Sequence, residues 1–198
     1  MTELGWGCLY TPVGQVSVAC TDAGVARVTY GPPPGPEPRL GTLASVLLEA
    51  TLEELTLYFG GHLKTFNVPV DLGSAQGSRR TVLSVLHETV GFGQTITYGG
   101  LAARAGLAAT AEPGNFVPPA RVVGQIMASN PVALIVPCHR VVAGTGLGGY
   151  SGGTGTDVKQ WLLVFEGAIP ATLDWDAAGL PARAADARLA QPTGSVAS

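Results

Sequence analysis

The chain has few cysteines, few charged residues and no long apolar run. Three cysteines, Cys8, Cys20 and Cys138, occur among 198 residues, of which only 13% are charged. So few cysteines, in an odd number, exclude a disulfide framework, fit a reducing compartment and leave at least one free thiol. No stretch reaches about eighteen consecutive apolar residues, and the N-terminus lacks the basic and apolar regions of a secretory signal. We therefore expect a cytoplasmic protein that no segment anchors in a membrane.

The charge balance does not by itself favour a nucleic-acid partner. The net charge is −3, whereas non-specific affinity for DNA comes mainly from cationic side chains that neutralise phosphates. Between residues 91 and 167, however, the cations slightly outnumber the acids. The cations there are Arg104, Arg121, Arg140 and Lys159, and the acids are Glu112, Asp157 and Glu166. The acidic excess therefore lies mostly outside this segment, and the 46% of hydrophobic residues can form a sizeable core.

The first third of the chain predicts a small α/β unit. Residues 13–30 alternate apolar and polar side chains around a turn signal at 22–24, which is typical of a β-hairpin. The proline-rich residues 31–36 can hold neither a ladder nor a helix. Thr42 can cap a helix that runs to about Phe59, and Phe66 to Leu72 is predicted as a short strand.

The next segment predicts three helices. Apolar residues recur at helical spacing from Ser78 to about Val90, and Thr97 can cap a short helix through Ala105. After a loop over 107–118, Pro119 suits the first position of a helix that carries Arg121 and ends near residue 129. Two short helices joined by a turn suggest a helix-turn-helix.

The last structured segment leads to a cysteine and a histidine. The apolar run 133–136 is expected to be buried and to deliver the sequence Pro137-Cys138-His139. A glycine-rich loop follows over 144–155, and Asp157 can cap a final helix that ends at Gly167. Beyond Pro170 the sequence has no sustained period, so we expect a weakly ordered tail.

Cys138 is the candidate nucleophile. A thiol attacks carbon only as a thiolate, and its pKa of about 8.5 must be lowered by a nearby base or cation. His139 and Arg140 are adjacent in sequence, and Glu166 could orient the histidine, as in the triads of hydrolases. The residues by themselves leave simpler alternatives open. Cys138 could be an inert buried thiol, His139 a hydrogen-bonded polar residue beside the core, and Glu166 a solvated acid at the end of a helix.

Residues 91–167 nevertheless carry a whole series of motifs in order. The most specific of them is the run Pro137-Cys138-His139-Arg140-Val141. In these motifs the segment resembles the catalytic domain of the O6-alkylguanine-DNA alkyltransferases, also called methylated-DNA–protein-cysteine methyltransferases. The matching pieces are residues 93–99, 101–102, 120–124, 130–131, 135–142, 149–153 and 159–167. Residues 11–14 and 58–61 resemble the N-terminal domain of the family more loosely.

The resemblance implies an α/β protein of two domains. Residues 1–75 would form an N-terminal α/β domain of ribonuclease H-like arrangement. Residues 76–170 would form a helical catalytic and DNA-binding domain with a helix-turn-helix of winged-helix-like type. Residues 171–198 would be the weakly ordered tail.

The resemblance also implies a single-turnover DNA-repair reaction. Cys138 would accept the alkyl group from O6-alkylguanine, with His139 acting as base through a water and Glu166 holding the imidazole. Asn130 would brace the turn that carries Cys138, and Tyr98 would donate a proton or hydrogen bond to the departing guanine. No cofactor is implied, and Cys8, Cys20, His62 and His87 show no spacing typical of metal ligands.

The partner implied is double-stranded DNA that carries the lesion, bound through its minor groove by a monomer. Because the base is inaccessible inside a duplex, it would be flipped out, and Arg121 would fill the gap in the stack. The further substrate contacts implied are Tyr150, Ser151, Val142, Lys159 and Arg140.

Some residues depart from the family pattern. Val122, Gln125 and Ile126 are bulkier than the small residues usual after the arginine, and the 107–118 connection is longer and carries Glu112. Two rival hypotheses are open, and the altered helix keeps the first of them alive. One is a non-enzymatic lesion sensor resembling the alkyltransferase-like proteins, although those lack the cysteine. The other is a cysteine hydrolase that turns over continuously.

Overall fold

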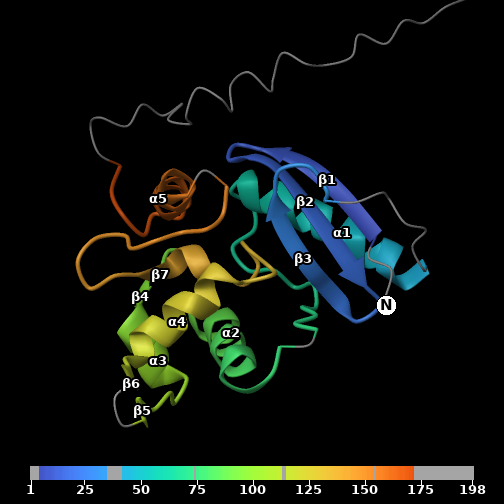
Figure 1. Ribbon diagram of the computed structural model, residues 1–198. Helices are drawn as coiled ribbons and strands as arrows, with labels where there is room; N and C mark the ends of the chain where they lie inside the picture. Colours follow the sequence, from blue (N-terminus) through green and yellow to red (C-terminus); the bar gives the residue numbers. More distant parts are fainter. Residues whose placement is uncertain (1–4, 35–41, 74, 113–114, 154, 172–198) are drawn as a thin grey trace, which may run out of the picture.

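The computed structural model describes residues 5–34, 42–73, 75–112, 115–153 and 155–171. A three-stranded sheet with one helix across it forms the first part, and four further helices with short strand pairs form the second (Figure 1). The architecture is therefore mixed α/β, as predicted. The predicted tail lies almost entirely outside the described residues. None of the described helices is long and apolar enough to cross a membrane.

The N-terminal sheet has the order β1 (Gly5–Thr11), β2 (Gly14–Thr21) and β3 (Gly24–Tyr30), all antiparallel. The predicted hairpin is the β2–β3 pair, and β1 is a strand that the sequence patterns did not reveal. Gly24 is required at the turn, because its φ is +145° and a Cβ there would lie 2.4 Å from the Pro69 carbonyl oxygen. Helix α1 (Thr42–Phe59) packs against the sheet, and its bounds match the prediction.

The prediction of a strand from Phe66 to Leu72 is wrong. Only one isolated bridge forms there, between Val70 and Val25. Val25 donates to the Pro69 oxygen at 2.8 Å and accepts from the Asp71 nitrogen at 2.9 Å. The segment therefore runs beside β3, but Pro69 has no N–H group with which to extend a ladder.

The second part contains the predicted helices. They are α2 (Gly77–Thr89), α3 (Tyr98–Arg104), α4 (Pro119–Ala128) and α5 (Thr156–Phe165). The Thr97 hydroxyl caps α3 by accepting from the Gly100 nitrogen at 3.0 Å, and Pro119 occupies the first turn of α4. Asp157 does not cap α5, because Gly155 holds that position with a φ of +79°.

Two short strand pairs complete the second part. β4 (Ile96–Thr97) pairs in parallel with β7 (Val141–Val142), which ties the start of α3 to the turn after Cys138. The segment between α3 and α4, expected to be a loop, contains a small hairpin of β5 (Thr110–Glu112) and β6 (Asn115–Val117). The side chain of Phe116 in this hairpin is exposed.

The two parts share one core. Buried residues of the sheet, of α1 and of the later helices belong to the same hydrophobic cluster. Val28 in β3 donates to the Pro131 oxygen at 2.9 Å and forms a parallel bridge with Val132. The N-terminal sheet is thus bonded directly to the segment that precedes Cys138.

Candidate active site

Cys138 lies at the start of a short 3₁₀ turn, Cys138–Arg140, at the end of a buried segment. Residues 133–136 are all buried, as expected, and Leu134 adopts a φ of +70°, which is unusual for a branched side chain. Asn130 spans this segment: its Nδ2 donates to the Val136 oxygen at 2.8 Å and its Oδ1 accepts from the Val132 nitrogen at 3.1 Å. The amide of Asn130 therefore holds both ends of the bend that presents the thiol.

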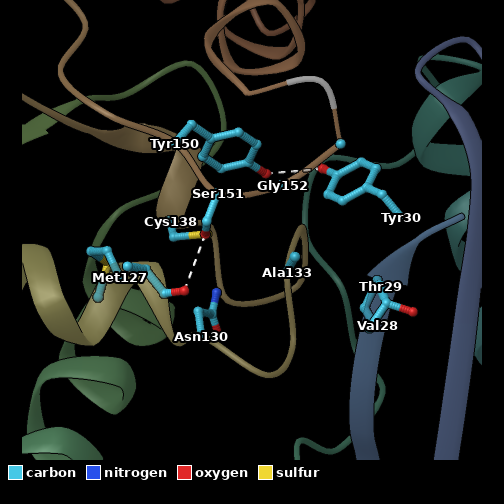
Figure 2. Close-up of a pocket in the computed structure, with 12 residues that line it drawn as sticks. Val28, Thr29, Tyr30, Met127, Asn130, Ala133, Cys138, Tyr150, Ser151 and Gly152 are labelled. Carbon is cyan, nitrogen blue, oxygen red and sulfur yellow. Dashed lines mark hydrogen bonds between the residues drawn. The ribbon is translucent and has the colours of Figure 1, made fainter. Parts of the chain in front are cut away.

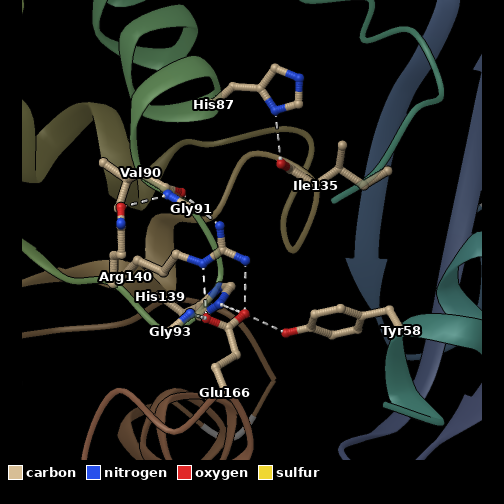
Figure 3. Close-up of polar contacts among 10 residues, drawn as sticks. Tyr58, His87, Val90, Gly91, Gly93, Ile135, His139, Arg140 and Glu166 are labelled. Carbon is tan, nitrogen blue, oxygen red and sulfur yellow. Dashed lines mark hydrogen bonds and ion pairs between the residues drawn. The ribbon is translucent and has the colours of Figure 1, made fainter. Parts of the chain in front are cut away.

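The imidazole of His139 meets the carboxylate of Glu166, which follows α5 directly (Figure 3). The distance from Nε2 to Oε1 is 3.0 Å, and both side chains are fully buried. Tyr58 in α1 also donates to Oε1, at 2.7 Å, and the Gly93 nitrogen donates to Oε2 at 3.3 Å. Sequence reasoning paired His139 with Glu166 but missed Tyr58, which lies 108 positions from Glu166 in the chain.

Arg140 occupies a place different from the predicted substrate contact. Its guanidinium is buried and donates twice to Glu166, from Nε at 2.9 Å and from Nη2 at 2.9 Å. Nη1 donates to the Val90 oxygen at 2.7 Å. Arg140 therefore neutralises the carboxylate inside the protein.

The pKa values of Glu166 and His139 decide which nitrogen of the imidazole carries a proton. Burial raises the pKa of Glu166, but hydrogen bonds and charges from His139 and Arg140 outweigh it and hold that pKa well below its usual range. Burial lowers the pKa of His139 despite the opposing effect of Glu166, so the imidazole is neutral at pH 7. Because a carboxylate only accepts, Nε2 carries the proton. Nδ1 is buried, and none of the described groups bonds to it. This nitrogen is free to accept a proton.

Acid should destabilise the fold through this group. A carboxylate whose pKa is depressed in the folded state stabilises it fully above the unfolded pKa, about 4.3, and loses that contribution as the pH falls further. His139 has the same effect: below about pH 6.5 it takes up a proton more readily in the unfolded chain than in the folded protein, so the free energy of unfolding falls as the pH falls. We expect Glu166 to cost about 1.4 kcal/mol of unfolding free energy for each pH unit below about 4.3. Urea unfolding at a series of pH values would measure this slope, and a Glu166→Gln protein with an equally steep slope would contradict it.

The thiol itself is not ionised in advance. Burial raises the pKa of Cys138, and the opposing effects of Asn130, Lys159 and Tyr150 are smaller. Lys159 is buried, not a solvated charge: its Nζ donates to the Val141 oxygen at 2.7 Å and to the Gly149 oxygen at 3.1 Å. Burial lowers the pKa of Lys159 to about 8. To act as a nucleophile, Cys138 would therefore need a base that removes its proton.

Two cavities meet at Cys138. One, of about 340 Å³, extends toward β3 and is lined by Tyr30, Ala133 and Gly152 (Figure 2). The other, of about 360 Å³, is lined by Tyr98, Gly124 of α4 and Gly149. Their shared walls are Met127, Ala128, Cys138, Tyr150 and Ser151. Three predicted residues, Tyr98, Tyr150 and Ser151, are thus brought to the thiol.

The remaining predicted contacts lie farther out. Val142 is in β7 and lines neither cavity; it pairs with Thr97. Arg121 is exposed in the first turn of α4, the helix that forms one cavity wall. Of the three bulky residues near it, Ile126 is buried, Val122 is half-buried and Gln125 is exposed. Part of the extra bulk therefore packs into the core and does not enlarge the outer face of α4.

The other cysteines lie outside this site. Cys8 is exposed and Cys20 is buried beside Thr51. Within the described ranges, no group of three or more histidine, cysteine or acidic side chains could hold a metal ion.

The fold and the site together define a mixed α/β protein with a buried cysteine between two cavities and a histidine–carboxylate pair behind it. A family model described as the DNA-binding domain of 6-O-methylguanine DNA methyltransferase matches residues 78–168. The methylated-DNA–protein-cysteine methyltransferase of Methanopyrus kandleri is 40% identical over 124 residues, which cover 62% of this chain and 83% of that protein. The mouse protein of the same name is 40% identical over 149 residues, which cover 74% of this chain.

A solved structure agrees with these relatives. Mycobacterium tuberculosis OGT in complex with DNA matches with a TM-score of 0.67 at 29% identity, covering 83% of this chain and 93% of that one. The chain belongs to the family of methylated-DNA–protein-cysteine methyltransferases. It spans 64% of the length of the mouse relative and 62% of that from Mycolicibacterium paratuberculosis.

Proposed function

We propose that this protein repairs DNA by transferring an alkyl group from O6-alkylguanine to Cys138. The observation that carries the proposal is a buried Cys138 at the junction of two cavities, next in the chain to a His139 whose imidazole is bonded to Glu166. Relatives named for the same activity support it. The enzyme class proposed is methylated-DNA–protein-cysteine S-methyltransferase.

The proposed reaction is an in-line displacement. A water relays the thiol proton of Cys138 to Nδ1 of His139, and the sulfur then forms a bond to the alkyl carbon as the bond from that carbon to O6 breaks. Glu166 stabilises the resulting imidazolium, as a carboxylate does in hydrolase triads. The products are a thioether and guanine. None of the described residues around Cys138 offers a group that would break the thioether, so each molecule would act once.

The leaving guanine needs a proton or a hydrogen bond. Tyr98 is suited to this, because burial and the neighbouring Cys138 raise its pKa and keep its hydroxyl protonated. The hydroxyl now donates to the Gly149 oxygen at 3.2 Å, a bond that an entering base can replace. The Lys159 ammonium lies 5.8 Å from the centre of the Tyr98 ring and adds positive charge on that side.

The proposed mode of DNA binding uses α3 and α4 as a helix-turn-helix. α4 would enter the minor groove, the damaged nucleotide would be flipped into the cavity beside Gly124, and Arg121 would replace it in the stack. The same proposal includes three further features: the protein acts as a monomer, its N-terminal domain is ribonuclease H-like, and the domain boundary lies at residues 75/76.

Stoichiometry tests the proposed function. Incubation with duplex DNA containing O6-methylguanine should add one methyl mass to the peptide containing Cys138, with no more than one group transferred per protein molecule. Intact-protein and peptide mass spectrometry would measure both. An unmodified Cys138 peptide after prolonged incubation contradicts the proposal, and continued turnover on an ester supports a cysteine hydrolase instead.

Arg121→Ala tests base flipping. Without a side chain to fill the stack, the flipped state loses the energy that offsets unstacking, a few kcal/mol per base. We expect transfer from duplex DNA to slow by at least about tenfold, with a smaller change on single-stranded DNA, where little stacking is lost. Single-turnover kinetics on both substrates measure the difference, with the exposed Arg27→Ala as a matched control. Equal slowing on both substrates would rule out this role.

A further inference from the structure

One contact joins β3 to the loop that carries two of the site residues. The phenol oxygens of Tyr30 and Tyr150 lie 2.9 Å apart, and their rings meet edge to face with centroids 6.4 Å apart (Figure 2). Both tyrosines line the cavity that reaches Cys138 from the side of β3. The predicted site included Tyr150 but not Tyr30, which lies 120 positions earlier in the chain.

The loop that contains Tyr150 and Gly152 packs closely against Tyr30. A Cβ added at Gly152 would lie 2.6 Å from Cε2 of Tyr30 and 2.7 Å from Cε1 of Tyr150. Two residues before Tyr30, Val28 bonds to Pro131 at the start of the segment that ends in Cys138. β3 therefore holds both chain segments that flank the thiol, and the phenol of Tyr30 is the side chain that reaches Tyr150.

Each of the two phenols has one O–H group and can therefore donate one hydrogen bond at a time. Burial raises the pKa of both Tyr30 and Tyr150, so each keeps one O–H. If Tyr30 donates to Tyr150, the Tyr150 proton is free to point elsewhere; with the opposite order it is used on Tyr30. A negative sulfur nearby favours the first order, because each hydrogen bond in such a chain strengthens the next.

Other ionisable groups surround the sulfur and bear on its charge. Burial raises the pKa of Cys138, and Asn130, Lys159 and Tyr150 act in the opposite direction. Tyr150 lines both cavities beside the thiol. The charge of a Cys138 thiolate raises the pKa of Tyr30, Tyr98 and Tyr150. The groups that face this region from the packed elements are Tyr58, Tyr98, His139, Tyr150 and Lys159, with Arg140 and Glu166 behind His139.

We propose that Tyr30 is a positioning residue of the alkyl-transfer site: by donating to Tyr150, it keeps the Tyr150 hydroxyl available to the Cys138 sulfur as the thiolate forms. This proposal rests on the proposed function only for its consequence in DNA repair. The sheet of the N-terminal part thus supplies a donor to the reacting group of the second part, acting through one intervening side chain.

A double-mutant cycle on thiol ionisation tests this role without DNA. The full chain and its Tyr30→Phe, Tyr150→Phe and doubly substituted forms are treated with iodoacetamide across pH, and modification of the Cys138 peptide is followed by mass spectrometry. We expect Tyr30→Phe to move the midpoint of the pH profile upward and to slow modification at pH 7 by about threefold to tenfold. The double variant should react no more slowly than Tyr150→Phe, because both substitutions remove the same effect. Tyr10→Phe, at an exposed tyrosine in β1, is the matched control.

Two results overturn the proposal. One is a Tyr30→Phe protein with an unchanged pH midpoint, even if its thermal unfolding temperature falls, since a purely structural contact would move only the latter. The other is additivity of the two substitutions. Methyl transfer from damaged DNA is measured on the same proteins: a wild-type chain that shows the expected iodoacetamide profile but takes no methyl group contradicts the proposed function and leaves the role of Tyr30 standing.

Discussion

A Cys138→Ser protein is expected to bind DNA containing O6-methylguanine with unchanged affinity and to transfer no methyl group. Cys138 is only 6% exposed and lines both cavities, so replacement of its sulfur by oxygen changes little of the surface that DNA could contact. A serine hydroxyl is far less acidic than a thiol, and a neutral histidine does not ionise it appreciably. We expect the transfer rate to fall by at least about a thousandfold, in line with the loss of other enzymatic nucleophiles.

The two halves of this prediction are measured separately. Fluorescence anisotropy with a lesion-containing duplex gives the dissociation constant, and mass spectrometry gives the methyl transfer. Cys8→Ser, at the exposed cysteine of β1, is the matched control and should transfer at the wild-type rate. Transfer that survives Cys138→Ser would place the acceptor elsewhere. Binding without transfer by the wild-type chain would instead favour the lesion-sensor hypothesis.

Glu166→Gln is expected to destabilise the fold and to slow the reaction. The carboxylate accepts from Tyr58, His139, Arg140 and Gly93, and its side chain is fully buried. An amide leaves the Arg140 guanidinium buried without a counter-charge, and removal of one partner from a buried ion pair typically costs about 3 to 5 kcal/mol. Chemical denaturation would measure this loss, and Glu53→Gln, an exposed glutamate on α1, should change stability by less than about 0.5 kcal/mol.

The kinetic part of the prediction concerns His139. A glutamine no longer fixes the proton on Nε2 or stabilises an imidazolium, so general-base catalysis by Nδ1 is impaired. We expect the rate of methyl transfer to fall by about 10² to 10⁴ at a temperature where the protein is still folded, as shown by circular dichroism. A folded Glu166→Gln protein that transfers at the wild-type rate would show that the histidine–carboxylate pair is structural only.

The N-terminal part of the chain has a more direct connection to the site than its sequence suggested. Tyr58 of α1 completes the bonding of Glu166, and Tyr30 of β3 meets Tyr150. Tyr58 also packs edge to face against Phe165, one residue before Glu166. The carboxylate that orients the histidine is therefore held from both parts of the molecule.

Local patterns predicted the helices well, because each has its own signals. α2 follows from apolar residues at helical spacing, α3 from the Thr97 cap, and α4 from Pro119 at its first position. The strand expected at 66–72 and the loop expected at 107–118 were wrong for a common reason. Whether a short segment forms a ladder depends on a partner strand and on available N–H groups, and Pro69 removes one such group.

The sequence by itself determined the chemistry that this chain can offer: the Pro137-Cys138-His139 run, the order of the motifs around it and the helices that carry them, because these depend on neighbouring residues. Only the tertiary structure decided that Arg140 faces inward to Glu166, that Nδ1 of His139 is left free, and that Tyr30 and Tyr58 belong to the site. The direction of a side chain and the pKa of a buried group depend on contacts between residues far apart in the chain, and no local pattern encodes those contacts.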